Sequence, residues 1–158
     1  MQIDKKVFRL DSSGESSAYF SKKSHIVVSK QNIKKLIRLS LTKKTDLRIC
    51  MHRNIYENLQ TMVNILLKKN EYFYSAHINT DEVYHIIEGK LLIIYFQNKK
   101  KKKILLNSNN KLFIMQKKTV HVTIPISKYC VIHETRNGPF DKKDNIFLNK
   151  VNLKDYNE

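Results

Sequence analysis

The apolar residues of this chain recur with two different periods, and the change of period divides the sequence. After Ser29, which can cap a helix, apolar residues follow at spacings of three and four positions as far as Leu41. This spacing is typical of one face of an α-helix, and the cations Lys43 and Lys44 suit its C-terminal end. The pattern predicts one amphipathic helix that lies across an apolar surface.

From residue 47 onward the period becomes that of β-strands. Short segments rich in Val, Ile, Tyr and Phe alternate with stretches that contain Asn, Gly, Ser or Lys. Short strands without intervening helices favour an antiparallel sandwich or barrel over a parallel α/β sheet. The predicted strands are Leu47–Met51, Leu59–Leu67, Tyr72–His77, Glu82–Glu88, Leu91–Phe96, Ile104–Leu106, Leu112–Met115, Thr119–Pro125 and Cys130–Thr135.

The two ends of the chain carry weaker patterns. Residues 1–24 include the Ser/Gly-rich stretch Ser12–Ser17 and show no clear period, so we expect an extension that packs as an edge strand or stays mobile. The tail from Asp141 onward has fewer strand signals and is expected to wrap the barrel surface. With 158 residues in all, residues 25–158 are expected to form a single domain with its own core.

Composition narrows the class of protein. Hydrophobic residues make up 41% of the chain, which is typical of globular proteins rather than disordered ones. Cys50 and Cys130 lie far apart with no CxxC pair, and we expect free thiols that pack as small apolar groups. No apolar run approaches the roughly 20 residues that cross a bilayer. Since no secretory signal begins the chain, we expect a cytoplasmic protein with no membrane partner.

The net charge of +16 suggests nucleic acid as a partner, because clustered cations neutralise phosphates. However, only five of the 30 basic residues are arginine, which base and phosphate recognition favour. The run Lys99–Lys103 lies between two predicted strands and is expected to form a solvated hairpin tip. A basic nucleic-acid-binding barrel is therefore the least favoured of the functional alternatives.

Two histidines and a carboxylate stand on the predicted strands. Alternation of side chains places Glu82 on the same face as Tyr84 and opposite to His85, so Glu82, His77 and His121 can converge inside a barrel. Two imidazoles and one carboxylate suit a divalent Fe, Mn, Ni or Zn ion and leave positions open for water or substrate. The alternative is that these are interior polar residues satisfied by their neighbours.

The spacing around these residues resembles the cupin motifs. His77, four residues, Glu82, six residues and then Gly89 matches the second half of the first cupin motif, HxH-x(3,4)-E-x(6)-G. The segment Gln116–His121 lies where cupins carry PxGxxH, so the resemblance places His121 on the last metal histidine. The resemblance therefore implies His77, Glu82 and His121 as metal ligands.

Three positions depart from the cupin pattern. Ser75 replaces the first motif histidine, and a hydroxyl is at best a weak ligand. Gln116 and Lys118 replace the Pro and Gly that precede the last histidine, so the turn there is expected to differ. A three-ligand site remains chemically sensible, but it should bind metal more weakly than a four-ligand site, and its metal can have been lost.

Three segments extend the likeness to one subgroup, the WbuC-type cupin-fold metalloproteins of surface-polysaccharide gene clusters. Arg48–His52 resembles that family's RxNLH segment, Glu82–Gly89 resembles its ESFHVIEG strand, and Glu134–Asp141 resembles its E-x-x-x-G-P-[YF]-D ending. The resemblance covers residues 25–148. It implies an all-β, antiparallel cupin jelly-roll barrel preceded by the one amphipathic helix.

The same resemblance implies a function. It suggests a metal-dependent enzyme that acts on a sugar or nucleotide sugar in surface-polysaccharide (O-antigen or lipopolysaccharide) biosynthesis, by isomerisation, epimerisation or hydrolysis. The alternative is a non-catalytic cupin that binds a small molecule and regulates or scaffolds a pathway. Cupins commonly dimerise, so a homodimer is expected. Candidates for the substrate pocket are Arg48, His52, Tyr84 and Glu134.

Overall fold

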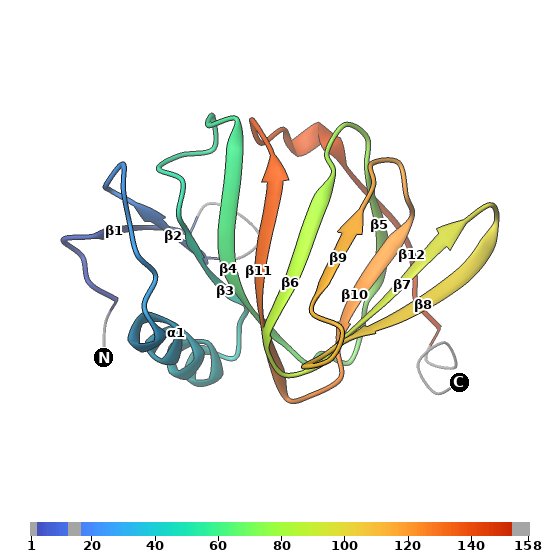
Figure 1. The fold of residues 1–158 in the computed structure, drawn as a ribbon, viewed down its shortest axis with the longest axis horizontal. Helices are drawn as coiled ribbons and strands as arrows, with labels where there is room; N and C mark the ends of the chain where they lie inside the picture. The colour runs from blue at the N-terminus through green and yellow to red at the C-terminus, as the bar shows by residue number, and fades with distance from the viewer. Residues whose placement is uncertain (1–2, 13–16, 153–158) are drawn as a thin grey trace.

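The structure is a computed structural model that describes residues 3–12 and 17–152, so residues 13–16 of the Ser/Gly-rich stretch lie outside the described residues. The described residues form two β-sheets and one α-helix (Figure 1). The elements, in order, are β1 (Phe8–Asp11), β2 (Ser17–Ser21), α1 (Lys30–Lys43), β3 (Leu47–Cys50), β4 (Leu59–Leu67), β5 (Phe73–His77), β6 (Glu82–Glu88), β7 (Leu91–Gln97), β8 (Lys100–Leu106), β9 (Leu112–Met115), β10 (His121–Pro125), β11 (Tyr129–Asn137), the 3₁₀ helix η1 (Lys142–Asp144) and β12 (Asn145–Lys150).

The two sheets face each other as in a jelly roll. The larger sheet has the strand order β1-β2-β3-β4-β11-β6-β9, and the smaller one has the order β12-β5-β10-β7-β8. Helix α1 lies at the β1–β4 end of the molecule, far from the β7–β8 hairpin (Figure 1). The predicted all-β jelly roll with one preceding helix is therefore confirmed.

Helix α1 begins and ends as its sequence predicts. The side chain of Ser29 accepts a hydrogen bond from the Asn32 amide at 3.2 Å, and the Asn32 side chain accepts one from the Ser29 amide. This capping box satisfies two amides at the start of the helix that have no partner within it. Leu36 and Ile37 are buried against the outer face of the larger sheet, together with Leu47, Ile49, Val63 and Ile65.

One strand pair departs from the predicted antiparallel arrangement. Strands β2 and β3 run parallel, with Ser17 opposite Leu47 and Phe20 opposite Cys50. Parallel neighbours need a long crossover connection, and α1 provides it. Through β2 and β1, part of the segment before residue 24 is therefore an extension of the larger sheet.

The run Lys99–Lys103 lies mostly outside the hairpin tip that the sequence predicted. Asn98 and Lys99 form the turn, with φ angles of 51° and 63°, as in the two-residue turns that fit the twist of a hairpin. Lys100–Lys103 belong to β8 and pair with β7, beginning with Lys100 opposite Gln97. The prediction was right for Lys99 and wrong for Lys100–Lys103, because a turn of two residues leaves these four lysines to the strand.

The tail also contains a strand that the sequence analysis missed. Asn145–Lys150 forms β12, which pairs with β5 at the edge of the smaller sheet. Ile146, Phe147 and Leu148 are consecutive and all exposed, so no alternation of apolar and polar residues marks this strand. The position of this strand is set by its pairing with β5, which is distant in sequence.

The interior between the sheets is apolar at one end and polar at the other. Cys50 and Cys130 are free and buried, and burial raises the pKa of each thiol to about 12, so both pack as apolar groups. The apolar end is formed by Tyr84, Ile86, Leu91, Ile93, Leu106, Met115, Cys130 and Ile132.

No helix in the described part of the chain is long and apolar enough to span a membrane.

Candidate metal centre

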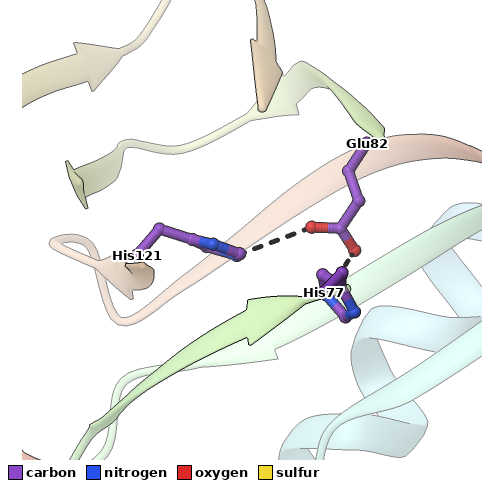
Figure 2. Close-up of side chains that lie close together, drawn as sticks. All are labelled: His77, Glu82 and His121. Atoms are coloured by element: carbon purple, nitrogen blue, oxygen red, sulfur yellow. Dashed lines mark ion pairs between the residues drawn. The ribbon is translucent and has the colours of Figure 1, made fainter. Parts of the chain in front are cut away.

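The three predicted ligands converge in the interior of the jelly roll. His77 ends β5, Glu82 begins β6 and His121 begins β10. The two imidazoles approach the two oxygens of the carboxylate from different sides (Figure 2), with Nε2 of His77 3.1 Å from Oε1 and Nε2 of His121 3.5 Å from Oε2. The ligand atoms all lie within 4.8 Å of one another. Ligands of one ion with bonds of about 2.1 Å lie roughly 3 to 4 Å apart, so this arrangement is close to that of a metal site.

Two loops hold the ligands in place. The His77 carbonyl accepts a hydrogen bond from the Lys118 amide at 2.5 Å. The carboxylate of Asp81, which directly precedes Glu82, accepts one from the Lys117 amide at 2.7 Å. The loop after β5 and the loop before β10 are therefore joined by one backbone hydrogen bond and one bond from a backbone amide to a side-chain carboxylate.

His121 is oriented by its own backbone. Its Nδ1 lies 2.9 Å from the Thr119 carbonyl, which is an acceptor only, so Nδ1 carries the proton. In the neutral ring the lone pair then belongs to Nε2, which faces Oε2 of Glu82. Two acceptors that face each other in a buried site are poorly satisfied unless a proton or a metal cation lies between them. This arrangement fits a metal ion.

The Glu82 carboxylate is a buried anion. Its side chain is only 4% exposed, and burial alone would raise its pKa. Its contacts with His121, His77 and Tyr84 outweigh burial and hold the pKa well below the usual range. The Tyr84 hydroxyl donates a hydrogen bond to Oε2, and burial together with the charge of Glu82 raises the tyrosine pKa well above its ordinary value. Tyr84 therefore stays protonated and fixes the orientation of the carboxylate.

His77 lies between two carboxylates. Its Nε2 faces Glu82, and its Nδ1 is buried without a hydrogen-bond partner among the described residues, 3.7 Å from Oδ2 of Asp144. The other oxygen of Asp144 accepts from the Asn79 amide at 2.6 Å. A carboxylate behind a histidine is the usual partner of a metal-binding imidazole, so the unpaired Nδ1 also fits a metal site.

The segment Glu134–Asp141 forms a wall of the site. Nη1 of Arg136 lies 3.8 Å from Oε1 of Glu82, and its guanidinium lies over the Phe140 ring at 5.3 Å. Asp141 caps η1, the short helix that ends with the buried Asp144. Sequence analysis missed Arg136 and Asp144, and the only signal for Asp144 was an acidic residue in a basic tail.

The departures from the cupin pattern have clear positions. Ser75 pairs directly with His121 across β5 and β10, so it occupies the place of a fourth ligand. Lys118 has a φ of 61°, the left-handed conformation that glycine adopts without steric cost. The turn before His121 therefore keeps a left-handed residue although lysine replaces glycine.

The four pocket candidates fall in different places. Arg48 and Glu134 line one interior cavity, and Tyr84 contacts Glu82. His52 is not among the described residues that line this cavity. It is 5% exposed, its Nδ1 lies 3.1 Å from the Thr61 carbonyl, and its ring packs edge-on against Phe20. Its environment is that of a packed, hydrogen-bonded core residue.

Comparisons with known proteins show the fold alone. No family model matches the sequence, and no curated protein matches it. The capsular polysaccharide assembling protein CapF from Staphylococcus aureus has a similar structure, with a TM-score of 0.54 and 16% identity over 64% of this chain and 31% of CapF. Peruvianin-I, a cysteine peptidase from Thevetia peruviana latex, has a TM-score of 0.51 and 13% identity over 60% of this chain and 58% of peruvianin-I. This chain thus spans less than two thirds of either protein, and it has the cupin-type jelly-roll fold.

Proposed function

We propose that this protein is a cytoplasmic cupin that binds a divalent metal and acts on a sugar or nucleotide sugar in surface-polysaccharide biosynthesis. The convergence of His77, Glu82 and His121 carries the metal part of this proposal. The sugar part is supported by the resemblance to WbuC-type cupins. CapF, which has a similar fold, is a capsular polysaccharide assembling protein, and this agrees with the sugar part.

The residues of the site have separate roles in this proposal. Nε2 of each histidine and the Glu82 carboxylate would hold the ion, and a bound ion would polarise a substrate oxygen. Tyr84 orients the carboxylate through its hydroxyl, and Arg136 adds a positive charge at 3.8 Å that offsets the buried anion. With three protein ligands, coordination positions stay open for substrate.

A non-catalytic cupin that binds a small molecule is the second candidate. Ser75 favours it, because the residue opposite His121 carries a hydroxyl where a third imidazole would be the fourth ligand. Turnover separates the two candidates: the metal-loaded chain is incubated with a panel of nucleotide sugars, and loss of substrate or change of sugar stereochemistry is followed by NMR. Binding without turnover favours the second candidate.

Metal content tests the first part of the proposal directly. Chain purified without a histidine tag is analysed for metals, and the metal-free chain is titrated with Fe²⁺, Mn²⁺, Ni²⁺ and Zn²⁺. One ion per chain is expected for at least one of these metals. Substoichiometric binding of all four would contradict a retained metal centre.

Metal affinity is expected to fall with decreasing pH, beginning above pH 6.5. Burial lowers the pKa of His77, but the hydrogen bond and charge of Glu82 outweigh it and raise the pKa overall. Metal binding needs the neutral imidazole, so protons compete at pH values above the ordinary histidine pKa of about 6.5. Calorimetric titration with Zn²⁺ at a series of pH values measures this, and an affinity that is constant down to about pH 6 would contradict it.

Ser75→His is expected to strengthen metal binding at least about tenfold, or by about 1.4 kcal/mol. Ser75 is on the same face of β5 as His77 and directly opposite His121, so a new imidazole at this position would reach the same ion. Competition with a chromophoric chelator measures the affinity. Ser75→Ala is the matched control and should bind like the natural chain, while equal affinities of all three chains would show that position 75 does not face the ion.

A homodimer is also proposed, formed through the outer face of β6 and β9. Val83, Ile87, Leu112 and Ile114 are exposed there, and neither strand contains a lysine or arginine although the chain carries a net charge of +16. Two copies can therefore approach at this face without like charges meeting. A monomeric mass in solution at micromolar concentration would contradict this arrangement.

A further inference from the structure

The two candidate histidine ligands are oriented in different ways. Nδ1 of His121 donates a hydrogen bond to the carbonyl of Thr119, its own near neighbour in the chain. Nδ1 of His77 instead faces Oδ2 of Asp144, which lies in η1, far along the chain. A metal-binding imidazole is usually held by an acceptor at its second nitrogen, so for His77 this acceptor has to come from the C-terminal part of the chain.

Asp144 is fixed against the loop that follows His77. The residue is 6% exposed, and its Oδ1 accepts a hydrogen bond from the Asn79 amide at 2.6 Å. Its backbone carbonyl accepts one from the Ile78 amide at 3.1 Å. Among the described residues, His77 is the only one within ion-pair distance of this carboxylate. The loop therefore uses Oδ1 and the carbonyl, and Oδ2 is left to face the His77 ring.

The contacts of His77 show which of its nitrogens carries a proton. Nε2 lies 3.1 Å from Oε1 of Glu82, and this carboxylate is an acceptor only, so Nε2 is a donor. In the neutral ring Nδ1 is then an acceptor that faces the acceptor Oδ2 of Asp144. The two atoms are 3.7 Å apart, which is longer than a hydrogen bond, in agreement with this mismatch.

We propose that Asp144 is a positioning residue of the metal centre, which accepts a hydrogen bond from Nδ1 of His77 when Nε2 binds the ion. A metal ion needs the lone pair of Nε2, so the proton on Nε2 leaves to solvent and Nδ1 takes one up from solvent. The charge of the ring is unchanged, and Nδ1 becomes a donor that faces an acceptor. This role deepens the proposed function and rests on the metal centre proposed there.

The same contact connects the metal centre with the C-terminal part of the chain. Asp144 ends η1, and η1 leads directly into β12, whose first residue, Asn145, lies opposite His77 in the smaller sheet. A hydrogen bond from His77 to Asp144 would hold this segment more firmly when metal is bound. By thermodynamic linkage, firm docking of the segment would in turn raise the affinity for metal.

Asp144→Asn separates this role from structural support of the loop. The Asn79 amide can donate only to the oxygen of the new side chain, so the NH₂ group would face Nδ1 of His77. A donor at this position favours a lone pair on Nδ1 and a proton on Nε2, and a protonated Nε2 does not bind metal. Zinc affinity, measured by competition with a chromophoric chelator, is expected to fall at least about tenfold.

Asp141→Asn is the matched control. Asp141 is an exposed carboxylate of the same segment, and its Oδ1 accepts from the Lys143 amide, as an asparagine oxygen also can. This variant should bind zinc like the natural chain. The metal-free Asp144→Asn chain should unfold at nearly the same urea concentration as the control, because its bond to Asn79 is kept. Equal zinc affinities of the folded Asp144→Asn chain and the control would overturn the proposal.

Long-range ¹H–¹⁵N spectra of the histidine rings test the proton position in the natural chain itself. The ¹⁵N-labelled chain is measured at mildly alkaline pH without metal and again with one equivalent of Zn²⁺. His77 is expected to carry its proton on Nε2 before zinc is added and on Nδ1 afterwards. A His77 ring that binds zinc through Nδ1, or that keeps its proton on Nε2 in the zinc-loaded chain, would overturn the role of Asp144.

The outcomes distinguish this inference from the proposed function. If the natural chain and Asp144→Asn bind zinc equally well, the metal centre stands and the role of Asp144 is overturned. If the natural chain binds no zinc, both are overturned. If zinc binds as expected but no nucleotide sugar is converted, the proposed enzymatic activity fails while the positioning role of Asp144 is supported.

Discussion

A His121→Ala chain is expected to bind divalent metal at least about 100-fold more weakly than the natural chain, a loss of about 2.8 kcal/mol. Its imidazole is one of only three ligands and is held in place by the hydrogen bond to Thr119. After the substitution only His77 and Glu82 would remain, and no other histidine, cysteine or carboxylate of the described residues belongs to the cluster. Calorimetric titration with the metal that the natural chain prefers measures the change.

His85→Ala is the matched control for this experiment. His85 is also on a strand, but it lies on the opposite face of β6 from Glu82 and pairs with His133 of β11. Its substitution should change metal affinity by less than about twofold. Equal losses in both variants would show that folding, and not ligation, is being measured. Unchanged affinity in His121→Ala would remove this residue from the ligand set.

Gly89→Ala is expected to destabilise the fold by about 3 kcal/mol. Gly89 has a φ of 86°, a backbone conformation that residues other than glycine rarely adopt. A Cβ at this position would lie 2.7 Å from the backbone carbonyl oxygen of Tyr129 and 3.1 Å from the Cα of Cys130. Because both obstacles are backbone atoms of β11, no side-chain rotation removes the clash. Urea unfolding followed by circular dichroism measures the midpoint.

Lys90→Ala provides the comparison for the glycine variant. Lys90 is the next residue and is exposed, so its substitution should change stability by no more than about 0.5 kcal/mol. A midpoint for Gly89→Ala within the range of this control would show that the turn between β6 and β7 can relax. The glycine of the first cupin motif would then have no structural requirement in this chain.

The sequence was most informative where one strand carries its own pattern. Alternation placed Glu82 and Tyr84 on one face and His85 on the other, and in the structure Glu82 contacts Tyr84 while His85 lies opposite His133. The spacing of His77 and Glu82 was enough to predict that they lie close together, since one short loop separates them. The partnership with His121 needed the family resemblance, because no local signal relates strands that are so distant in sequence.

Contacts between distant segments account for what the sequence did not predict. The parallel pairing of β2 with β3 and the pairing of β12 with β5 depend on where the chain returns, and neither leaves a periodic signal. Asp144 reaches His77 through a short helix in the tail, and Asn64 of β4 donates a hydrogen bond to Glu134 of β11. A single polar residue on an otherwise apolar strand indicates a polar contact in the core. The sequence does not identify the residue that makes the other half of this contact.

The pairing of β4 with β11 bears on when the protein can acquire a metal. These strands pair from Leu59 opposite Asn137 to Leu67 opposite Tyr129, so their contact closes a long loop, and chains dominated by such contacts fold slowly. The three candidate ligands all lie on strands within that loop. A newly synthesised chain therefore offers metal ions only separate side chains until the barrel closes. The ion that is bound is then chosen from those available where folding finishes, so the place and timing of folding become part of metal selectivity.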